Sequence, residues 1–151
     1  MNIVVLAGGL STERDVSLNT GTMVSKALRS KGHNVIMLDV FMGYHEEEED
    51  ITDIFNHTEE ASADVAQIPG EAPDIAQVKA MRKDQSACFF GPNVIKICQA
   101  ADIVFMALHG ENGENGKIQA AVIWEGPLPW IKEFQKKCLR QLVFRHRTVL
   151  Q

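Results

Sequence analysis

Two polar, glycine-rich stretches of the sequence each follow an apolar run, and both contain side chains that could bind a charged ligand. Residues 8–15 read GGLSTERD after the run NIVVLA, and residues 109–116 read HGENGENG after DIVFMAL. Glycine lets the backbone come close to a ligand, and free N–H groups at the start of a following helix favour an anion. The carboxylate of Glu13 could pair with the ammonium group of an amino acid, and His109 could approach the same ligand.

Each of these features also has a purely structural interpretation, which the spacing leaves open. Gly8 and Gly9 could form a tight turn that packing requires. Glu13 in the first turn of a helix would interact favourably with the helix dipole, by about 0.3–1 kcal/mol. A single histidine at a strand end, such as His109, is more often a hydrogen-bonded structural residue than a catalyst. The Gly8-Gly9 pair lacks the G-x-G-x-x-G pattern, so a nicotinamide cofactor is disfavoured.

The elements that must position these loops alternate between strands and helices. Apolar runs predict strands at residues 2–7, 34–40 and 102–108 of a parallel sheet, the first buried on both faces and the second also buried. Residues at three- and four-residue spacing predict a helix over 16–31, ended by Gly32. The inward face of that helix is expected to hold Val16, Thr20, Met23, Val24, Ala27, Leu28 and Lys31.

Shorter helices are predicted at residues 74–82, behind Pro73, at 93–100, and from Lys117 onward. The pattern predicts an α/β fold, a short open parallel sheet with helices on both faces, similar to a Rossmann-like domain. Ligands of such sheets bind beyond the carboxyl ends of the strands. We therefore expect Glu13 and His109 at one edge of the sheet.

Residues 43–73 break this pattern and are predicted to form an insertion. Residues 45–50 read HEEEED, and the stretch to about Gly70 has few large apolar residues, so we expect a solvated, partly mobile segment. A metal site at the acidic run is the alternative, but consecutive carboxylates on one short segment seldom converge on one ion.

Composition excludes several classes of protein. The chain is 45% hydrophobic and 23% charged, and no apolar run approaches the roughly 20 residues that span a bilayer. The start, MNIVVLAGG, lacks the charged region of a signal peptide. Cys88, Cys98 and Cys138 form neither a disulfide framework nor a metal motif. We expect a cytoplasmic chain with no membrane partner and no bound metal.

Two motifs resemble one family closely. GGLSTERDVSLNTG is similar to the pattern G-G-x-S-x-E-R-x-V-S-L of D-alanine–D-alanine ligases, and ALHGENGENGKIQ resembles their pattern A-L-H-G-x-x-G-E-D-G-x-I-Q. Both occur in the family's order and follow predicted strands, and the similarity covers about residues 2–121. Asn115 stands where the family usually has aspartate, which puts one supporting contact in doubt.

The resemblance implies roles for individual residues. The glutamate that matches Glu13 orients the amino group of the first D-alanine, and the residues matching Ser17 and His109 support that end of the site. The acid that matches Glu114 helps to hold the loops together. On this basis we expect Glu13, Ser17 and His109 to be catalytic. The expected substrate-binding residues are Gly8, Gly9, Ser11, Glu13, His109, Gly110 and Glu114.

The resemblance also implies a reaction that makes D-Ala-D-Ala for peptidoglycan of the cell wall. ATP phosphorylates the carboxylate of one D-alanine, and the amine of a second attacks the acyl phosphate. ATP and magnesium ions bind in the later, ATP-grasp domains of the family, so we expect no cofactor in these 151 residues and no activity from them alone. The alternative is a non-catalytic binding or dimerisation module. Such a module could form a homodimer or pair with an intact ligase. An unrelated nucleotide-binding domain is the weakest hypothesis.

The last part of the sequence, residues 122–151, differs from the rest. Residues 132–151 carry six basic residues and one acidic residue, whereas the remainder carries nine basic and nineteen acidic residues. If codons 129–150 are read one base earlier, synonymous choices yield AMDKGISKKMFKAAGVPTPY, which resembles the family's next segment. We infer a frameshift near residues 121–129. The alternative, a basic patch selected for nucleic acid, is disfavoured, and no nucleic-acid partner is expected.

Overall fold

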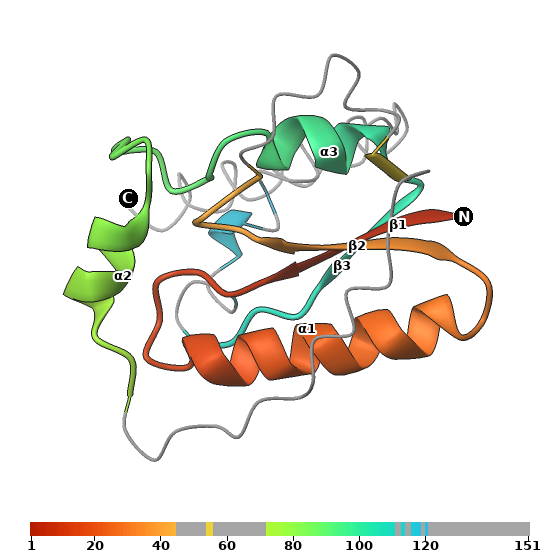
Figure 1. Ribbon diagram of the computed structural model, residues 1–151, viewed down its shortest axis with the longest axis horizontal. Helices are drawn as coiled ribbons and strands as arrows, with labels where there is room; N and C mark the ends of the chain where they lie inside the picture. The colour runs from red at the N-terminus through yellow and green to blue at the C-terminus, as the bar shows by residue number, and fades with distance from the viewer. Residues whose placement is uncertain (45–53, 56–71, 111–112, 114–115, 119, 121–151) are drawn as a thin grey trace, which may run out of the picture.

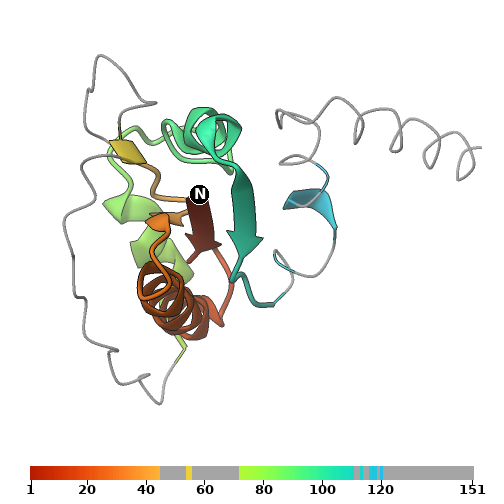
Figure 2. The same ribbon diagram turned by 90° about the vertical axis from the view of Figure 1, so that its right-hand side faces the viewer.

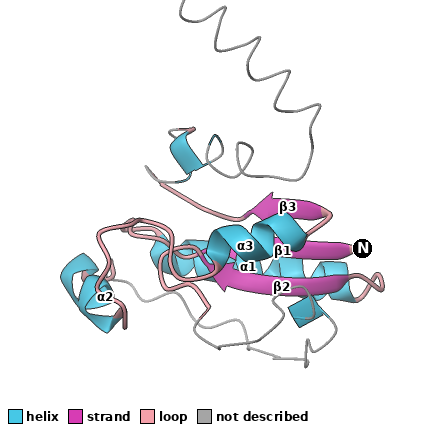
Figure 3. Ribbon diagram, turned by 90° about the horizontal axis from the view of Figure 1, so that it is seen from above, coloured by secondary structure: helices cyan, strands magenta, loops and turns pink. Residues whose placement is uncertain are grey.

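Three parallel strands form the centre of the protein. The computed structural model describes residues 1–44, 54–55, 72–110, 113, 116–118 and 120. The strands are β1 (Asn2–Ala7), β2 (Asn34–Asp39) and β3 (Ile103–Met106), in the order β2-β1-β3. Figure 3 shows β1 between its two neighbours. The predicted open parallel sheet is therefore confirmed.

Helices cover both faces of this sheet, as the sequence predicts. The helix α1 (Arg14–Arg29) packs on one face and α3 (Val94–Ala100) on the other (Figure 1). The side chains of β1 alternate between two apolar clusters because successive residues of a strand point to opposite faces. Val4 and Leu6 pack with Val94 and Ile97 of α3. On the opposite face, the cluster that Leu18, Val24 and Leu28 cover consists of Ile3, Val5, Ala7, Val35 and Ala107.

The helix α2 (Ile75–Met81) stands apart from these layers, beyond the carboxyl ends of the strands (Figure 1). Figure 2 views the molecule from its side and shows α1 and α3 on opposite sides of the strands. Asp74 is the N-cap of α2, and its side chain accepts a hydrogen bond from the N–H of Ala76 at 2.8 Å. Pro73 therefore directly precedes the N-cap residue of α2.

The buried face of α1 agrees only in part with the predicted one, because Val24 and Leu28 pack on the sheet as expected but other positions do not. Ser17, Gly21 and Ser25 are buried, whereas Met23 is 60% exposed and Ala27 is exposed. The reason is the close approach of the helix to the sheet: a Cβ atom on Gly21 would lie 2.8 Å from the Cβ of Ala7. Small side chains are needed there, and an apolar periodicity does not detect them.

Part of the predicted insertion is packed. Ile54 and Phe55 are 5% and 2% exposed, in the cluster on the α3 face, so the expectation of a solvated segment is wrong for these two residues. Tyr44 donates its N–H to the carbonyl of Pro92 at 2.9 Å and so also belongs to the fold. Residues 45–53 and 56–71, including the acidic run, lie outside the described residues.

Beyond β3, the described residues include the start of the helix expected from Lys117. Lys117, Ile118 and Ala120 are helical, and the Ala120 N–H donates to the carbonyl of Gly116 at 2.9 Å. The predicted tail, residues 122–151, lies outside the described residues. Among the described helices, none is long and apolar enough to cross a membrane.

Candidate functional site

The two glycine-rich loops meet at the carboxyl edge of the sheet. The hydroxyl of Ser11, after β1, donates to the backbone carbonyl of His109, after β3, at 2.9 Å. A Cβ atom on Gly110 would lie 3.1 Å from the Cβ of Ser11 and 3.7 Å from the carboxyl carbon of Glu13. The expectation that Glu13 and His109 lie at one edge is confirmed, because the strands that precede both loops are parallel neighbours.

Glu13 is exposed and lies at the N-cap of α1, but its side chain makes no capping hydrogen bond. Its own N–H donates to the Ser11 hydroxyl at 3.2 Å, and its carbonyl accepts from the N–H of Ser17 at 3.0 Å. The backbone of Glu13 is thus held by neighbours on both sides. The helix dipole can still favour its charge, but the carboxylate is not used as a cap and is accessible to a ligand.

Ser17 is fully buried, and its hydroxyl links the ends of the two strands that precede the loops. Its hydroxyl accepts from the N–H of Gly8 at 2.8 Å and donates to the carbonyl of Ala107 at 2.8 Å. Because both of its hydrogen bonds are made with backbone groups, the Ser17 hydroxyl positions the ends of β1 and β3 and does not face a ligand.

The Gly8-Gly9 pair does not present free N–H groups. Gly8 donates to Ser17, and the N–H of Gly9 donates to the carboxylate of Asp39 at 3.4 Å. A Cβ atom on Gly8, whose φ is +74°, would lie 2.5 Å from Oδ2 of Asp39. The structure therefore supports the packing interpretation of these two glycines.

Arg14 and Asp39 hold the first loop in place and were not predicted as site residues. The guanidinium of Arg14 forms an ion pair with Asp39, and its Nη1 donates to the carbonyl of Gly9 at 2.8 Å. Asp39 also accepts from the N–H groups of Phe41 and Met42 at 2.9 and 3.1 Å. Both side chains are largely buried, with 11% and 15% exposed. The signal in the sequence was a charged residue at the end of an apolar strand.

His109 is held through its ring as well as its backbone. Its Nε2 lies 3.0 Å from the hydroxyl of Thr20 on α1, and this hydroxyl donates to the carbonyl of Val16 at 2.9 Å. The sequence placed Thr20 on the inward face of the helix but did not connect it with His109, because a helix periodicity does not show which loop lies above it.

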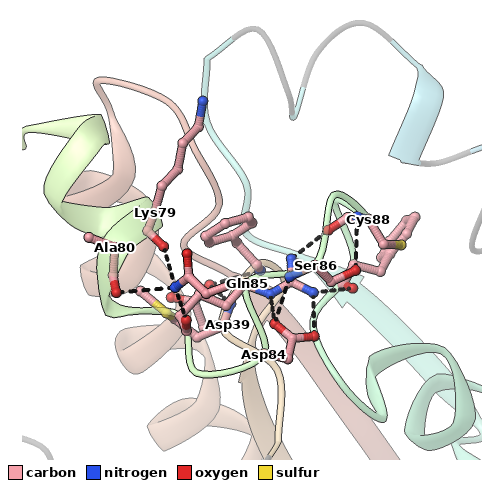
Figure 4. Close-up of polar contacts among 11 residues, drawn as sticks. Asp39, Lys79, Ala80, Asp84, Gln85, Ser86 and Cys88 are labelled. Carbon is pink, nitrogen blue, oxygen red and sulfur yellow. Dashed lines mark hydrogen bonds and ion pairs between the residues drawn. The ribbon is translucent and has the colours of Figure 1, made fainter.

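A second cluster lies beside the loop that follows β1. A pocket of about 390 Å³ is lined by Leu10 and Phe41 and by residues of the segment from α2 to Phe89. Arg82, 2% exposed, pairs with Asp84, with Nε 2.5 Å from Oδ1, and donates to the carbonyls of Cys88 and Phe90 (Figure 4). Its guanidinium also lies 4.8 Å from the centre of the Phe41 ring. Through these hydrogen bonds the guanidinium of Arg82 holds the turn after α2 in place, so its role is structural.

Three further points concern the expected site: two residues of the second loop, a metal ion and a buried cysteine. Glu114 and Asn115 lie outside the described residues. No group of three or more His, Cys, Asp or Glu residues suited to a metal ion occurs within the described part of the chain. Burial raises the pKa of the Cys98 thiol to about 12, so this side chain is not a nucleophile near neutral pH.

The comparisons with known proteins agree on one family. A family model described as D-ala D-ala ligase N-terminus matches residues 2–126. The D-alanine–D-alanine ligase of Lacticaseibacillus casei (strain BL23) is 46% identical over 123 residues, which are 80% of this chain and 33% of that protein. The ligase of Pediococcus pentosaceus is also 46% identical over 123 residues, 81% of this chain and 34% of that protein.

A more distant relative, the D-alanine–D-alanine ligase of Gluconobacter oxydans (strain 621H), is 34% identical over 130 residues. The chain thus spans about a third of the length of the L. casei and P. pentosaceus ligases. The family match includes both loops of the candidate site and most of the sequence. The chain therefore belongs to the family of D-alanine–D-alanine ligase N-terminal domains.

Proposed function

We propose that residues 1–121 form the side of a D-alanine–D-alanine ligase that holds the first D-alanine, in the synthesis of the D-Ala-D-Ala dipeptide for peptidoglycan. The hydrogen bond from the Ser11 hydroxyl to the His109 carbonyl carries this proposal, because it brings both family motifs to one edge of the sheet. The relatives are D-alanine–D-alanine ligases by name, which supports the same reaction.

In this proposal the exposed carboxylate of Glu13 pairs with the ammonium group of D-alanine, and His109 and Gly110 form the opposite wall. The buried residues hold these groups in place: Ser17 ties the strand ends together, and the ion pair of Arg14 with Asp39 fixes the loop that precedes Glu13. Such support matters because a binding group must be held near its productive geometry. In this proposal Glu114, in the second loop, helps to hold the two loops together.

The phosphoryl-transfer part of the reaction is assigned to the rest of the ligase. Transfer from ATP needs metal ions and cationic groups around the transferred phosphate. We propose that ATP and magnesium bind in the two thirds of the relatives' length that this chain does not match. The 151-residue chain by itself would then bind D-alanine weakly and form no dipeptide.

The test uses a chimera in which residues 1–126 of this chain replace the matched segment of the L. casei ligase. Loss of one charged hydrogen bond costs about 1.5–3 kcal/mol, so Glu13→Gln should weaken binding of the first D-alanine about 10- to 100-fold and leave ATP binding unchanged. Asp15→Asn is the matched control, because it removes a carboxylate two residues further along, in the first turn of α1. An equal loss of D-alanine and ATP binding in Glu13→Gln would overturn the assignment.

A further inference from the structure

Thr20 lies between the helix backbone and the imidazole of His109. Its hydroxyl oxygen is 2.9 Å from the carbonyl oxygen of Val16, one turn earlier in α1, and 3.0 Å from Nε2 of His109. The backbone of His109 is held from another element, by the hydroxyl of Ser11. The loop after β1 thus holds the backbone of His109, and α1 holds its ring. Together these two contacts define the orientation of the ring.

The positions of the hydrogens follow from the capacity of a hydroxyl, which has one hydrogen and two lone pairs. If the Thr20 hydroxyl donates to Val16, its oxygen can accept a hydrogen bond from Nε2–H of His109, and two hydrogen bonds form. If the hydroxyl donates to Nε2 instead, only one forms, and two oxygens face each other at 2.9 Å without a hydrogen between them. The first arrangement gains one hydrogen bond, which is worth about 0.5–1.5 kcal/mol.

We propose that Thr20 is a positioning residue that fixes the tautomer of His109, with the hydrogen on Nε2, and leaves Nδ1 as the ring nitrogen that meets the amino-acid ligand. The second half of this statement rests on the proposed function of the site. The arrangement is the same in the neutral ring and in the imidazolium, because Nε2 carries a hydrogen in both. In the neutral ring, Nδ1 is then the nitrogen that accepts a hydrogen bond.

The experiment measures the tautomer of His109 by ¹⁵N NMR of the 151-residue chain, with the signals assigned by comparison with His109→Gln. The neutral ring of the parent chain should carry its hydrogen on Nε2. Thr20→Val keeps the shape of the side chain but removes the acceptor, so the ratio of the Nε2–H to the Nδ1–H tautomer should fall about 2- to 12-fold. Thr20→Ser retains the hydroxyl and should restore the parent ratio.

Thr22→Val is the matched control. Thr22 makes the same hydrogen bond to the backbone one turn earlier, 2.9 Å to the carbonyl of Leu18, on the same helix, but its other contact is the sulfur of Met37. This variant loses the same hydroxyl–helix bond and should leave the His109 ratio unchanged. If Thr20→Val perturbs the fold, judged by its amide spectrum, Thr20→Ala repeats the comparison with a smaller side chain.

A parent ring with its hydrogen on Nδ1, or an unchanged ratio in both Thr20→Val and Thr20→Ala, would overturn the proposal. Failure of the proposed function gives a different result. In that case the tautomer responds to Thr20 as expected, but Glu13→Gln in the chimera does not weaken D-alanine binding. Thr20 would then position His109 without serving a D-alanine site.

Discussion

The hydroxyl of Ser17 donates to the carbonyl of Ala107 at 2.8 Å, so the first turns of α1 are hydrogen bonded directly to the chain that leaves β3. The same oxygen accepts from the N–H of Gly8, at the end of β1. One buried side chain thereby sets the separation of the two loops. This explains why the loop of Glu13 and the loop of His109 meet, although about a hundred residues separate them in the sequence.

Ser17→Ala should destabilise the fold. The change leaves a buried N–H and a buried carbonyl without their partner, and each such group costs about 1–3 kcal/mol. We expect a loss of about 2–6 kcal/mol in the free energy of unfolding, measured with urea. Ser25→Ala is the control on the same helix, because Ser25 is equally buried but its hydroxyl has no hydrogen-bond partner within the described structure. A loss of equal size in both variants would contradict the role given to Ser17.

Asp39→Ala should loosen the loop that precedes Glu13 and the turn after β2. It removes the partner of Arg14 and the acceptor of the Phe41 and Met42 N–H groups. Removal of one member of a largely buried ion pair costs about 3–5 kcal/mol. Hydrogen exchange at Phe41 and Met42 should accelerate more than exchange at Val4 in β1. Asp74→Ala, which removes an exposed N-cap of α2, should cost only about 1 kcal/mol.

The two described cysteines should react very differently with an alkylating reagent. The pKa of Cys98 is raised by burial to about 12 from 9.0, so at pH 8 its thiolate fraction is lower by about a thousandfold than that of an unshifted thiol. Cys88 is exposed. Mass spectrometry of the native chain should find Cys88 labelled and Cys98 unlabelled, while both should be labelled in denaturant. Rapid native labelling at Cys98 would show that the α3 face opens.

The sequence predicted the three strands because each is a continuous apolar run. It predicted the meeting of the two loops because the carboxyl ends of parallel strands share an edge of the sheet. It predicted only part of the buried face of α1, because a close approach at Gly21 selects small residues there instead of large apolar ones. It also did not identify Arg14, Thr20 and Asp39 as residues that support the site. Their partners lie on other elements, and neither propensity nor periodicity carries information about such contacts.

The proposed frameshift can be tested on the nucleotide sequence alone. The family match ends at residue 126, inside the interval 121–129 where the change of frame is expected. Codons 129–150, read one base earlier, should encode AMDKGISKKMFKAAGVPTPY or a close variant, followed by an open ATP-grasp frame. A shifted frame with stop codons or without this likeness would contradict the hypothesis and leave residues 122–151 as a selected sequence.

We propose that this chain provides the D-alanine side of a ligase whose phosphoryl-transfer machinery lies elsewhere. The direct measurement is dipeptide formation with ATP, magnesium and D-alanine, by the 151-residue chain and by the chimera with the remainder of the L. casei ligase. The chimera should form D-Ala-D-Ala, whereas the 151-residue chain should form none and release no phosphate above background. Dipeptide formation by the 151-residue chain that is lost in Glu13→Gln would contradict this proposal, as would a folded chimera that binds ATP but forms no dipeptide.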